Sequence, residues 1–436
     1  MKKIKEFHTI SNMELSELAP NEHGDWLNQR NDAFFSFIPL TDKIEKNTFW
    51  KNGIYCRGLE SSRDSFVYQS NKTEIKNNMK QSINFFNSEV AKFNKVINRN
   101  PKAKAKDYIA YDDKKISWSR AFLTDIDNLK TKTFDETNVV IAIYRPFFKQ
   151  YLYFSREMNN VVSRMDSFFP TQKHKNLVIC LSCVGSSKEL SVVISDIIPD
   201  LHLVGDTQCF PLYYYKEEKD ELFQEHHRQD AISDFILKRC KEQYGKNVTK
   251  EDIFYYVYGF LHSPKYREAF TSDLKKMLPR LPLVEDVRDF WAFSKAGRAL
   301  AELHLNYENV GKLSGVVEKC ESQNPSYLVE KMRFGKNGKE VDKSKIIYNS
   351  QISLENIPDK AYEYVVNGKS AIEWIMERYQ VTTHKESGIV NNPNDWAKEM
   401  GKPRYILDLL HSVINLSVQT VKVVQGLPGV EFGDTN

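Results

Sequence analysis

The sequence lacks any apolar run long enough to cross a membrane. No stretch approaches the roughly 18 consecutive apolar residues that a spanning helix needs, and the N-terminus MKKIKEFHTISN has no apolar core of the kind that marks a secretory signal. Cysteine is scarce, because only 6 of 436 residues are cysteine and they are scattered along the chain. That pattern excludes a disulfide scaffold and is typical of a reducing compartment. We therefore expect a soluble, cytoplasmic protein with no membrane partner.

A strong excess of charge of one sign is also missing. The net charge is +4, far from that of a histone-like protein. The cations are nevertheless unevenly distributed, and two runs stand out: Lys92, Lys95, Arg99, Lys102, Lys104 and Lys106, and then Lys331, Arg333, Lys336, Lys339, Lys343 and Lys345. Such runs attract DNA phosphates through counterion release. A solvated surface remains the alternative for any run of lysines.

The motifs of several enzyme classes are absent. An amino-methyltransferase needs a glycine-rich loop that admits S-adenosylmethionine and an Asn/Asp-Pro-Pro-aromatic tetrapeptide that holds the target amine, and neither occurs. No Walker sequence supports ATP hydrolysis, and segment 335–339 (GKNGK) lacks the strand-to-helix context of a phosphate loop. We therefore predict no catalytic residue, no metal ligand and no cofactor in this chain.

One arrangement of charges keeps a self-contained metal-dependent DNA nuclease open as the alternative function. Asp200, Glu217 and Lys219 loosely match the PD...(D/E)xK pattern, in which two carboxylates hold a divalent ion and a lysine assists the attacking water. In a chain with 58 acidic and 62 basic residues such a match arises readily by chance. Solvated turn charges are the competing interpretation.

A CxxC pair, Cys180 and Cys183, lies within the run LVICLSC. A redox pair or half of a zinc site would use this spacing, but no second half of a zinc site is present. The run has the composition of a strand, in which positions three apart face opposite sides. We interpret both residues as core thiols.

The spacing of apolar residues predicts an α+β fold in which a mixed sheet region precedes a helical subdomain. From residue 73 to Phe93 apolar residues recur at helical spacing behind the capping pair Asn71 and Glu74, which predicts a long amphipathic helix. Short β-branched or apolar runs predict strands of one sheet at 139–144, 177–183, 190–194 and 201–204. Later patterns predict helices at 231–244, 249–262, 264–277, 284–303 and 404–424, with a hairpin or loop at 334–345.

Several blocks of sequence stand out for their composition and order. The densest is 253–308, which contains IFYYVYGFLHSPKYREAF and LPRLPLVEDVRDFWAFSKAGRALAELHLNYE. The others are GDWLNQRNDAFFSFIPL (24–40), GLESSRDSFVYQ (58–69), IYRPFFKQYLYF (143–154), QCFPLYYY (208–215) and YEYVVNGKSAIEWIMERYQV (362–381). In this order they resemble, over nearly the whole chain, the C-terminal target-recognition region of type ISP restriction-modification enzymes and of related adenine-methylating restriction enzymes.

The resemblance implies a DNA sequence-recognition, or specificity, module of a phage-defence system. Such a module is non-catalytic alone and positions double-stranded DNA for an adenine-N6 methyltransferase and a restriction motor. S-adenosylmethionine, ATP and Mg²⁺ are then expected only in the nuclease, motor and methyltransferase domains that this sequence lacks. The chain is expected to be a C-terminal fragment, a split subunit or an excised domain that partners a methyltransferase or helicase-nuclease subunit.

The resemblance and the composition together predict four parts. They are an N-terminal segment trailing a methyltransferase core (1–70), a long helix with a β-rich DNA-recognition subdomain (71–215), a helical subdomain (216–325) and a C-terminal segment with a hairpin and the long terminal helix (326–436).

Candidate DNA contacts follow from the chemistry of base edges and phosphates. Arg and Lys suit guanine, Asn and Gln suit adenine, and backbone amides of a small-residue turn can approach an anion. The loop RMDSFFPTQKHK (164–175), the turn GSSK (185–188) and the two cationic runs meet these demands. The predicted DNA-binding residues are Arg164, Gln172, Lys173, Lys175, Ser186, Ser187, Lys188, Arg333, Asn337, Lys339, Lys102 and Lys104. Arg145 in YRPF is expected to form either a structural ion pair or a phosphate contact.

Overall fold

The computed structural model describes residues 13, 15–27, 29–219 and 224–432, and its fold is α+β, as the sequence predicts. The helices are α1 Asp32–Phe35, α2 Asp64–Val67, α3 Lys72–Ile97, α4 Arg120–Asp127, α5 Met165–Phe168, α6 Asp234–Tyr244, α7 Lys250–Phe260, α8 Pro264–Ala269, α9 Thr271–Lys276, α10 Val287–Leu305, α11 Ala371–Arg378, α12 Pro393–Glu399 and α13 Tyr405–Gln425. Among these described residues, no helix combines the length and apolarity that a bilayer crossing requires.

The strands are short and most pair in hairpins or small sheets. They are β1 Ile38–Pro39, β2 Cys56–Arg57, β3 Tyr68–Gln69, β4 Val139–Arg145, β5 Phe148–Tyr153, β6 Val178–Leu181, β7 Val192–Ser195, β8 Ile198–Pro199, β9 Gln208–Pro211, β10 Tyr213–Lys219, β11 Gln224–Asp230, β12 Arg280–Leu281, β13 Val317–Cys320, β14 Arg333–Asn337, β15 Glu340–Ile347, β16 Ile352–Glu355, β17 Val365–Val366, β18 Lys369–Ser370, β19 Thr382–Thr383 and β20 Val390–Asn391.

The predicted single sheet is wrong, because its strands divide between two four-stranded sheets. One sheet has the order β2-β9-β6-β7 and the other β3-β5-β4-β8. The predicted strand at 201–204 is also wrong. Asp200 Oδ1 accepts a hydrogen bond from the His202 amide at 2.8 Å, and Gly205 has a φ of +81°, so the chain turns there instead of extending. The hairpin predicted at 334–345 is confirmed as β14 and β15.

Sheet β2-β9-β6-β7 is buried on both faces and separates two hydrophobic cores. Val178 and Cys180 of β6 contribute to the core that also contains α3, β4, β5 and α13. Ile179 and Leu181 contribute to the core formed with α6, α7 and α10. Successive side chains of a strand point to opposite faces, so a continuous apolar run fills both cores. The predicted domain boundaries stay predictions.

The central thiols belong to the first of these cores. Cys56, Cys209 and Cys180 lie opposite one another across β2, β9 and β6, and all three are buried and free. Burial raises the pKa of the Cys56 thiol to about 12. The expectation of a core thiol is confirmed for Cys180, whereas Cys183 is only half-buried at the strand end.

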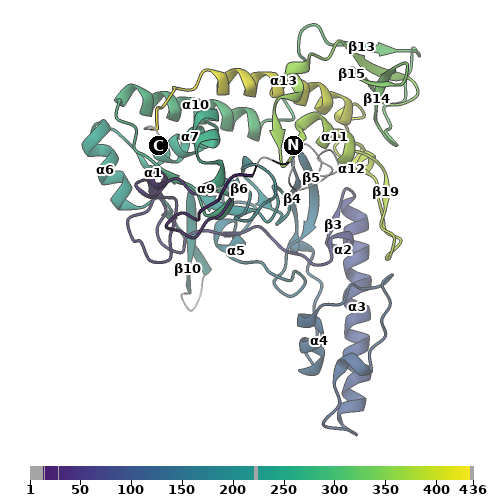
Figure 1. The fold of residues 1–436 in the computed structure, drawn as a ribbon. Helices are drawn as coiled ribbons and strands as arrows, with labels where there is room; N and C mark the ends of the chain where they lie inside the picture. Colours follow the sequence, from purple (N-terminus) through teal and green to yellow (C-terminus); the bar gives the residue numbers. More distant parts are fainter. Residues whose placement is uncertain (1–12, 14, 28, 220–223, 433–436) are drawn as a thin grey trace.

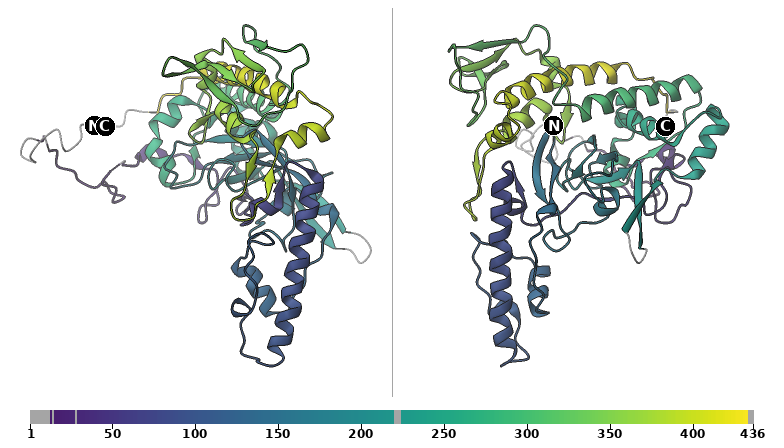
Figure 2. Two further views of the ribbon diagram at one scale, coloured as in Figure 1. Left: turned by 90° about the vertical axis from the view of Figure 1, so that its right-hand side faces the viewer. Right: turned by 180° about the vertical axis from the view of Figure 1, so that it is seen from behind.

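The long predicted helix is confirmed as α3, which projects from the body as an arm (Figure 1, Figure 2). The Asn71 side chain accepts hydrogen bonds from the Thr73 and Glu74 amides and caps the helix. Its apolar face buries Ile75, Met79, Ile83, Phe86, Val90 and Phe93. With 26 residues at about 1.5 Å each, the arm is about 39 Å long.

The helical region differs from its prediction in one place and contains a very close helix contact. The helix predicted at 264–277 is interrupted at Phe270 and forms α8 and α9. Helices α7 and α10 cross at two glycines: a Cβ on Gly259 would lie 2.2 Å from the Phe293 carbonyl oxygen, and one on Gly297 would lie 1.9 Å from the Tyr255 carbonyl oxygen. Only glycine at both positions permits this separation.

His304 joins α10 to α7 and α13 within the core. Because its side chain is buried, we expect the protein to lose stability in acid. Its Nδ1 lies 2.6 Å from the Tyr258 hydroxyl and its Nε2 lies 3.1 Å from the Thr420 hydroxyl. Burial lowers its pKa from 6.5 to about 3. Because the folded pKa is depressed, the stabilisation is present above pH 6.5 and is lost as the pH falls through the window between the two values.

From this shift we expect the free energy of unfolding to fall by about 2 kcal/mol between pH 7 and pH 5 on account of His304. Urea titrations at both pH values measure it. In His304→Gln this part of the pH dependence should disappear, whereas the exposed His202→Gln should keep it. An unchanged pH dependence in His304→Gln would contradict the assignment.

Candidate functional site

The predicted DNA contacts Lys102 and Lys104 lie at the tip of the arm. The segment alternates Lys and Ala, and Ala103 and Ala105 are buried at 7% and 0% exposure, so the lysines face outward. The Ala105 amide donates to Asp127 Oδ1 at 2.7 Å, which fixes the turn. In the part of the chain that the structure describes, the tip cations without an ion-pair partner are Lys95, Arg99, Lys102, Lys104 and Lys106.

The segment from Arg164 to Lys175 lies between β5 and β6 and includes α5, whose Met165 and Phe168 are buried, whereas its predicted DNA contacts face outward. Asn176 at its end donates to the carbonyl oxygens of Phe168 at 3.0 Å and Tyr213 at 2.8 Å. Arg164, Gln172, Lys173 and Lys175 are exposed. Gln172 Nε2 donates to the Val139 carbonyl at 3.3 Å, which occupies part of its amide. Lys173 and Lys175 make no ion pair with a described residue.

The other predicted contacts lie elsewhere. In the turn that begins at Gly185, Ser186 is half-buried, Ser187 and Lys188 are exposed, and Lys188 Nζ already donates to the Asn367 carbonyl at 2.8 Å. Arg333, Asn337 and Lys339 are exposed on the β14–β15 hairpin. That hairpin and the free end of α3 lie at opposite ends of the molecule in Figure 1, so the predicted residues do not form one patch.

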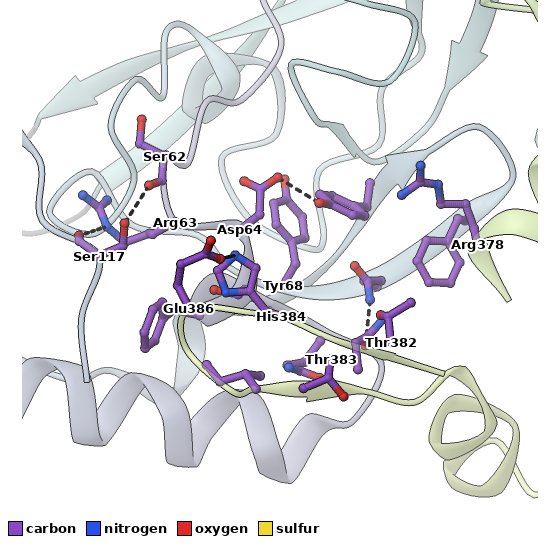
Figure 3. Close-up of a pocket in the computed structure, with 18 of the residues that line it drawn as sticks. Ser62, Arg63, Asp64, Tyr68, Ser117, Arg378, Thr382, Thr383, His384 and Glu386 are labelled. Carbon is purple, nitrogen blue, oxygen red and sulfur yellow. Dashed lines mark hydrogen bonds and ion pairs between the residues drawn. The ribbon is translucent and has the colours of Figure 1, made fainter. Parts of the chain in front are cut away.

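A cleft of about 660 Å³ lies where α2, β5 and the β19–β20 hairpin meet (Figure 3). Arg63 and Asp64 of this cleft lie in block 58–69 of the sequence resemblance and Arg378 lies in block 362–381, whereas His384 and Asn391 lie in none of these blocks. Its charged lining consists of Arg63 and Arg378 against Asp64, Asp113, Glu377 and Glu386. With two cations against four carboxylates, the cleft does not attract phosphates.

Arg63 supports this cleft structurally. It is 4% exposed, its Nη1 donates to the Ser61 carbonyl at 3.0 Å, and its Nη2 donates to the Ser119 hydroxyl at 3.0 Å. The guanidinium carbon lies 3.8 Å from the centroid of the Phe122 ring. Burial lowers its pKa to about 10, so it remains charged at neutral pH. These contacts leave Arg63 inaccessible to a phosphate.

Arg145 forms the structural ion pair that was one of its two expected roles. Its Nη1 lies 2.5 Å from Asp200 Oδ1, and its Nη2 lies 3.5 Å from Asp64 Oδ2. The Tyr144 hydroxyl donates to the same Asp64 oxygen at 2.8 Å. Burial raises the pKa of Asp200 to about 7, and the Arg145 guanidinium opposes that rise.

The geometry does not assemble the nuclease alternative. Asp200 is 1% exposed and bound to Arg145, whereas Glu217 is exposed on the β10–β11 hairpin. The side chain of Lys219 lies outside the described residues. Within the described ranges, the only cluster of His, Cys and acidic residues spaced to hold a metal is Glu22, His23 and Asp32, which includes none of the three.

Comparisons with known proteins agree with this description of the fold. The model of the type ISP C-terminal specificity domain matches residues 53–409. A nuclease-deletion mutant of the type ISP restriction-modification enzyme LlaGI, solved in complex with a DNA substrate mimic, is 35% identical with a TM-score of 0.83 over 97% of this chain and 31% of that one. The ATP-dependent type ISP enzyme LlaBIII bound to DNA is also 35% identical, with a TM-score of 0.83 over 95% of this chain and 25% of that one.

A third structure, the DrdV-DNA complex, is 26% identical with a TM-score of 0.78 over 96% of this chain and 41% of that one. No curated protein sequence matches. The α+β fold and these likenesses define a specificity domain of the restriction-modification class. The chain belongs to the family of type ISP C-terminal specificity domains, and it spans about a third or less of the LlaGI and LlaBIII chains.

Proposed function

We propose that this chain recognises the DNA target of a type ISP-like restriction-modification system and has no catalytic step of its own. The proposal rests on a set of outward cations that make no ion pair with any described residue. They lie on an arm and a loop of a fold that matches parts of enzymes solved with DNA. Unpaired surface cations gain most from phosphate contact, because they displace counterions without first breaking an ion pair.

The arm and the other elements have different tasks in this proposal. The arm of about 39 Å is comparable with one turn of B-DNA, about 34 Å. Its tip therefore contacts phosphates about one turn away from the body. Gln172, Arg333 and Asn337 carry the side-chain types that read adenine or guanine edges, and Lys173, Lys175 and Lys339 add charge beside them.

The catalytic steps belong, in this proposal, to partners in the cytoplasm. A methyltransferase that binds S-adenosylmethionine and a motor that uses ATP and Mg²⁺ act on the duplex that this chain holds. Selection of duplexes from a randomised library by the purified chain tests the recognition role. Enrichment of one asymmetric sequence is expected, and recovery of an unenriched pool would overturn the role.

A salt titration tests the contribution of the arm. The slope of log Kobs against log salt is negative, and each lost phosphate contact makes it shallower by about 0.9. We therefore expect the slope for the double variant Lys102→Ala, Lys104→Ala to be shallower by about 1.8, and its binding to all duplexes to be weaker to the same extent. Fluorescence anisotropy with a labelled duplex at several salt concentrations measures the slope.

The matched control removes two exposed lysines from α6, Lys238 and Lys241. This variant should keep the slope of the unaltered chain. Equal slopes for the unaltered chain and the arm variant would show that the tip does not contact DNA. The library selection, which depends on base contacts, would still report on recognition.

A further inference from the structure

A second cavity, of about 750 Å³, lies among loop 187–192, α8, the β17–β18 turn and the C-terminal end of α13. It shares no lining residue with the cleft of Figure 3. Its wall contains His262 and Arg267, which belong to the block 253–308 that dominates the sequence resemblance. The DNA contacts proposed above use none of that block.

Arg267 in this wall makes no direct ion pair with a described residue, although the Glu189 carboxylate is near enough to favour its charged form. The side chain is half-buried, and its Nε donates to the Leu261 carbonyl at 2.6 Å. No carboxylate of the described chain forms an ion pair with its two terminal nitrogens. A cation removed from water is costly unless an anion pairs with it. The terminal nitrogens of Arg267, which lines the cavity, are therefore available to an anion.

Two more polar atoms of the wall are buried and lack a partner within the described residues. They are the Tyr364 hydroxyl and His262 Nε2, on side chains that are 7% and 5% exposed. Tyr364 stacks on His304 with ring centroids 5.1 Å apart and an interplanar angle of 7°, which fixes its position. His262 Nδ1 lies 2.7 Å from the Tyr258 carbonyl and donates to it, so Nε2 of the neutral ring is an acceptor.

The charges around the cavity favour an anion. Arg267, Lys188 and Lys275 are three cations against the two carboxylates Glu189 and Glu363, which leaves a net charge of +1. Arg267 is also near enough to Tyr364 to oppose the rise in the Tyr364 pKa that burial causes. Arg267 and Tyr364 both line this cavity.

We propose that this cavity binds a phosphate-type oxyanion. The terminal nitrogens of Arg267 donate to two of its oxygens, as the planar fork of arginine does to phosphate and carboxylate. The Tyr364 hydroxyl donates to a third oxygen. The oxyanion belongs either to a small phosphorylated compound or to the DNA backbone, and the two sources share this chemistry.

Titration of the full chain with inorganic phosphate tests the site, with NaCl at matched ionic strength as the reference. We expect a saturable rise in Tm and a saturable calorimetric signal with phosphate alone. Arg267→Gln should bind phosphate about tenfold more weakly or worse, because it loses the charge-assisted fork. The matched control, Arg288→Gln, removes an exposed arginine that is paired with Asp286 and should bind like the unaltered chain.

Tyr364→Phe keeps the stacked ring and removes only the hydroxyl, so it tests the site even if Arg267→Gln folds poorly. We expect it to weaken phosphate binding about two- to tenfold. The proposal is overturned if the unaltered chain shows no saturable response beyond NaCl, or if a folded Arg267→Gln variant titrates like the unaltered chain.

Duplex binding by the same variants separates the two sources. If Arg267→Gln loses both the phosphate response and affinity for duplex, and phosphate competes with DNA, the site holds a backbone phosphate. If it loses the phosphate response and keeps duplex affinity, the site holds a small phosphorylated compound. Both results support an oxyanion site. An Arg267→Gln variant that keeps the phosphate response contradicts it in either case.

Discussion

Gly297→Ala is expected to destabilise the protein by about 3 kcal/mol or more, because the added methyl group would lie 1.9 Å from the Tyr255 carbonyl oxygen. That atom is backbone within α7, so the two helices must separate. Helix propensity predicts the opposite sign, since alanine favours a helix interior over glycine by about 1 kcal/mol. We expect the steric cost to exceed the gain in helix propensity. The free energy of unfolding, measured with denaturant, tests this.

Gly426→Ala is the matched control for this substitution. Gly426 has φ −89° and ψ 1°, and the nearest atom to an added Cβ, the Val423 carbonyl oxygen, lies 3.5 Å away. Its free energy of unfolding should stay within about 0.5 kcal/mol of that of the unaltered chain. If Gly297→Ala were as stable as Gly426→Ala, the close approach of α7 and α10 would be wrong.

Asp200→Ala is expected to lower the free energy of unfolding by about 3 to 5 kcal/mol, because the buried Arg145 guanidinium loses the carboxylate with which it pairs. Among the described residues, Asp64, at 3.5 Å, is then the remaining carboxylate that pairs with Arg145. Combining Asp200→Ala with Arg145→Leu removes both charges and should recover part of the loss. Urea titrations of the two single variants and the double variant give the coupling energy of the pair.

The same variant addresses the nuclease alternative. Plasmid DNA incubated with the chain and Mg²⁺ or Mn²⁺ should show no cleavage that depends on Asp200, because that carboxylate is committed to Arg145. A variant that unfolds like the unaltered chain but abolishes a metal-dependent cleavage would reverse this assignment. Asp200→Asn, which keeps the shape of the side chain, separates loss of charge from loss of packing.

Elements with a strong local pattern were predictable from the sequence. Helix α3 follows from its apolar spacing and the Asn71 cap. These features depend on residues within a few positions of one another. The assignment of β4 and β6 to one sheet failed because strand partners are chosen by contacts between distant segments.

The candidate site was predictable only in part. The alternation of Lys and Ala at 102–106 indicates outward cations, and the structure places them so. Whether such a residue contacts DNA stays a prediction. The cleft in Figure 3 had no local signal, because Asp64 and His384 meet there from segments that are far apart in the chain.

The sequence by itself determined the family, the α+β class and the positions of the cationic runs, since these depend on residue type and short-range spacing. The tertiary structure alone decided which charges are neutralised. Arg145 is paired with Asp200, whereas Arg267 and the cations at the arm tip make no direct ion pair with a described residue. Ion pairing requires atoms within a few ångströms of one another, and only the folded chain brings residues from distant segments that close.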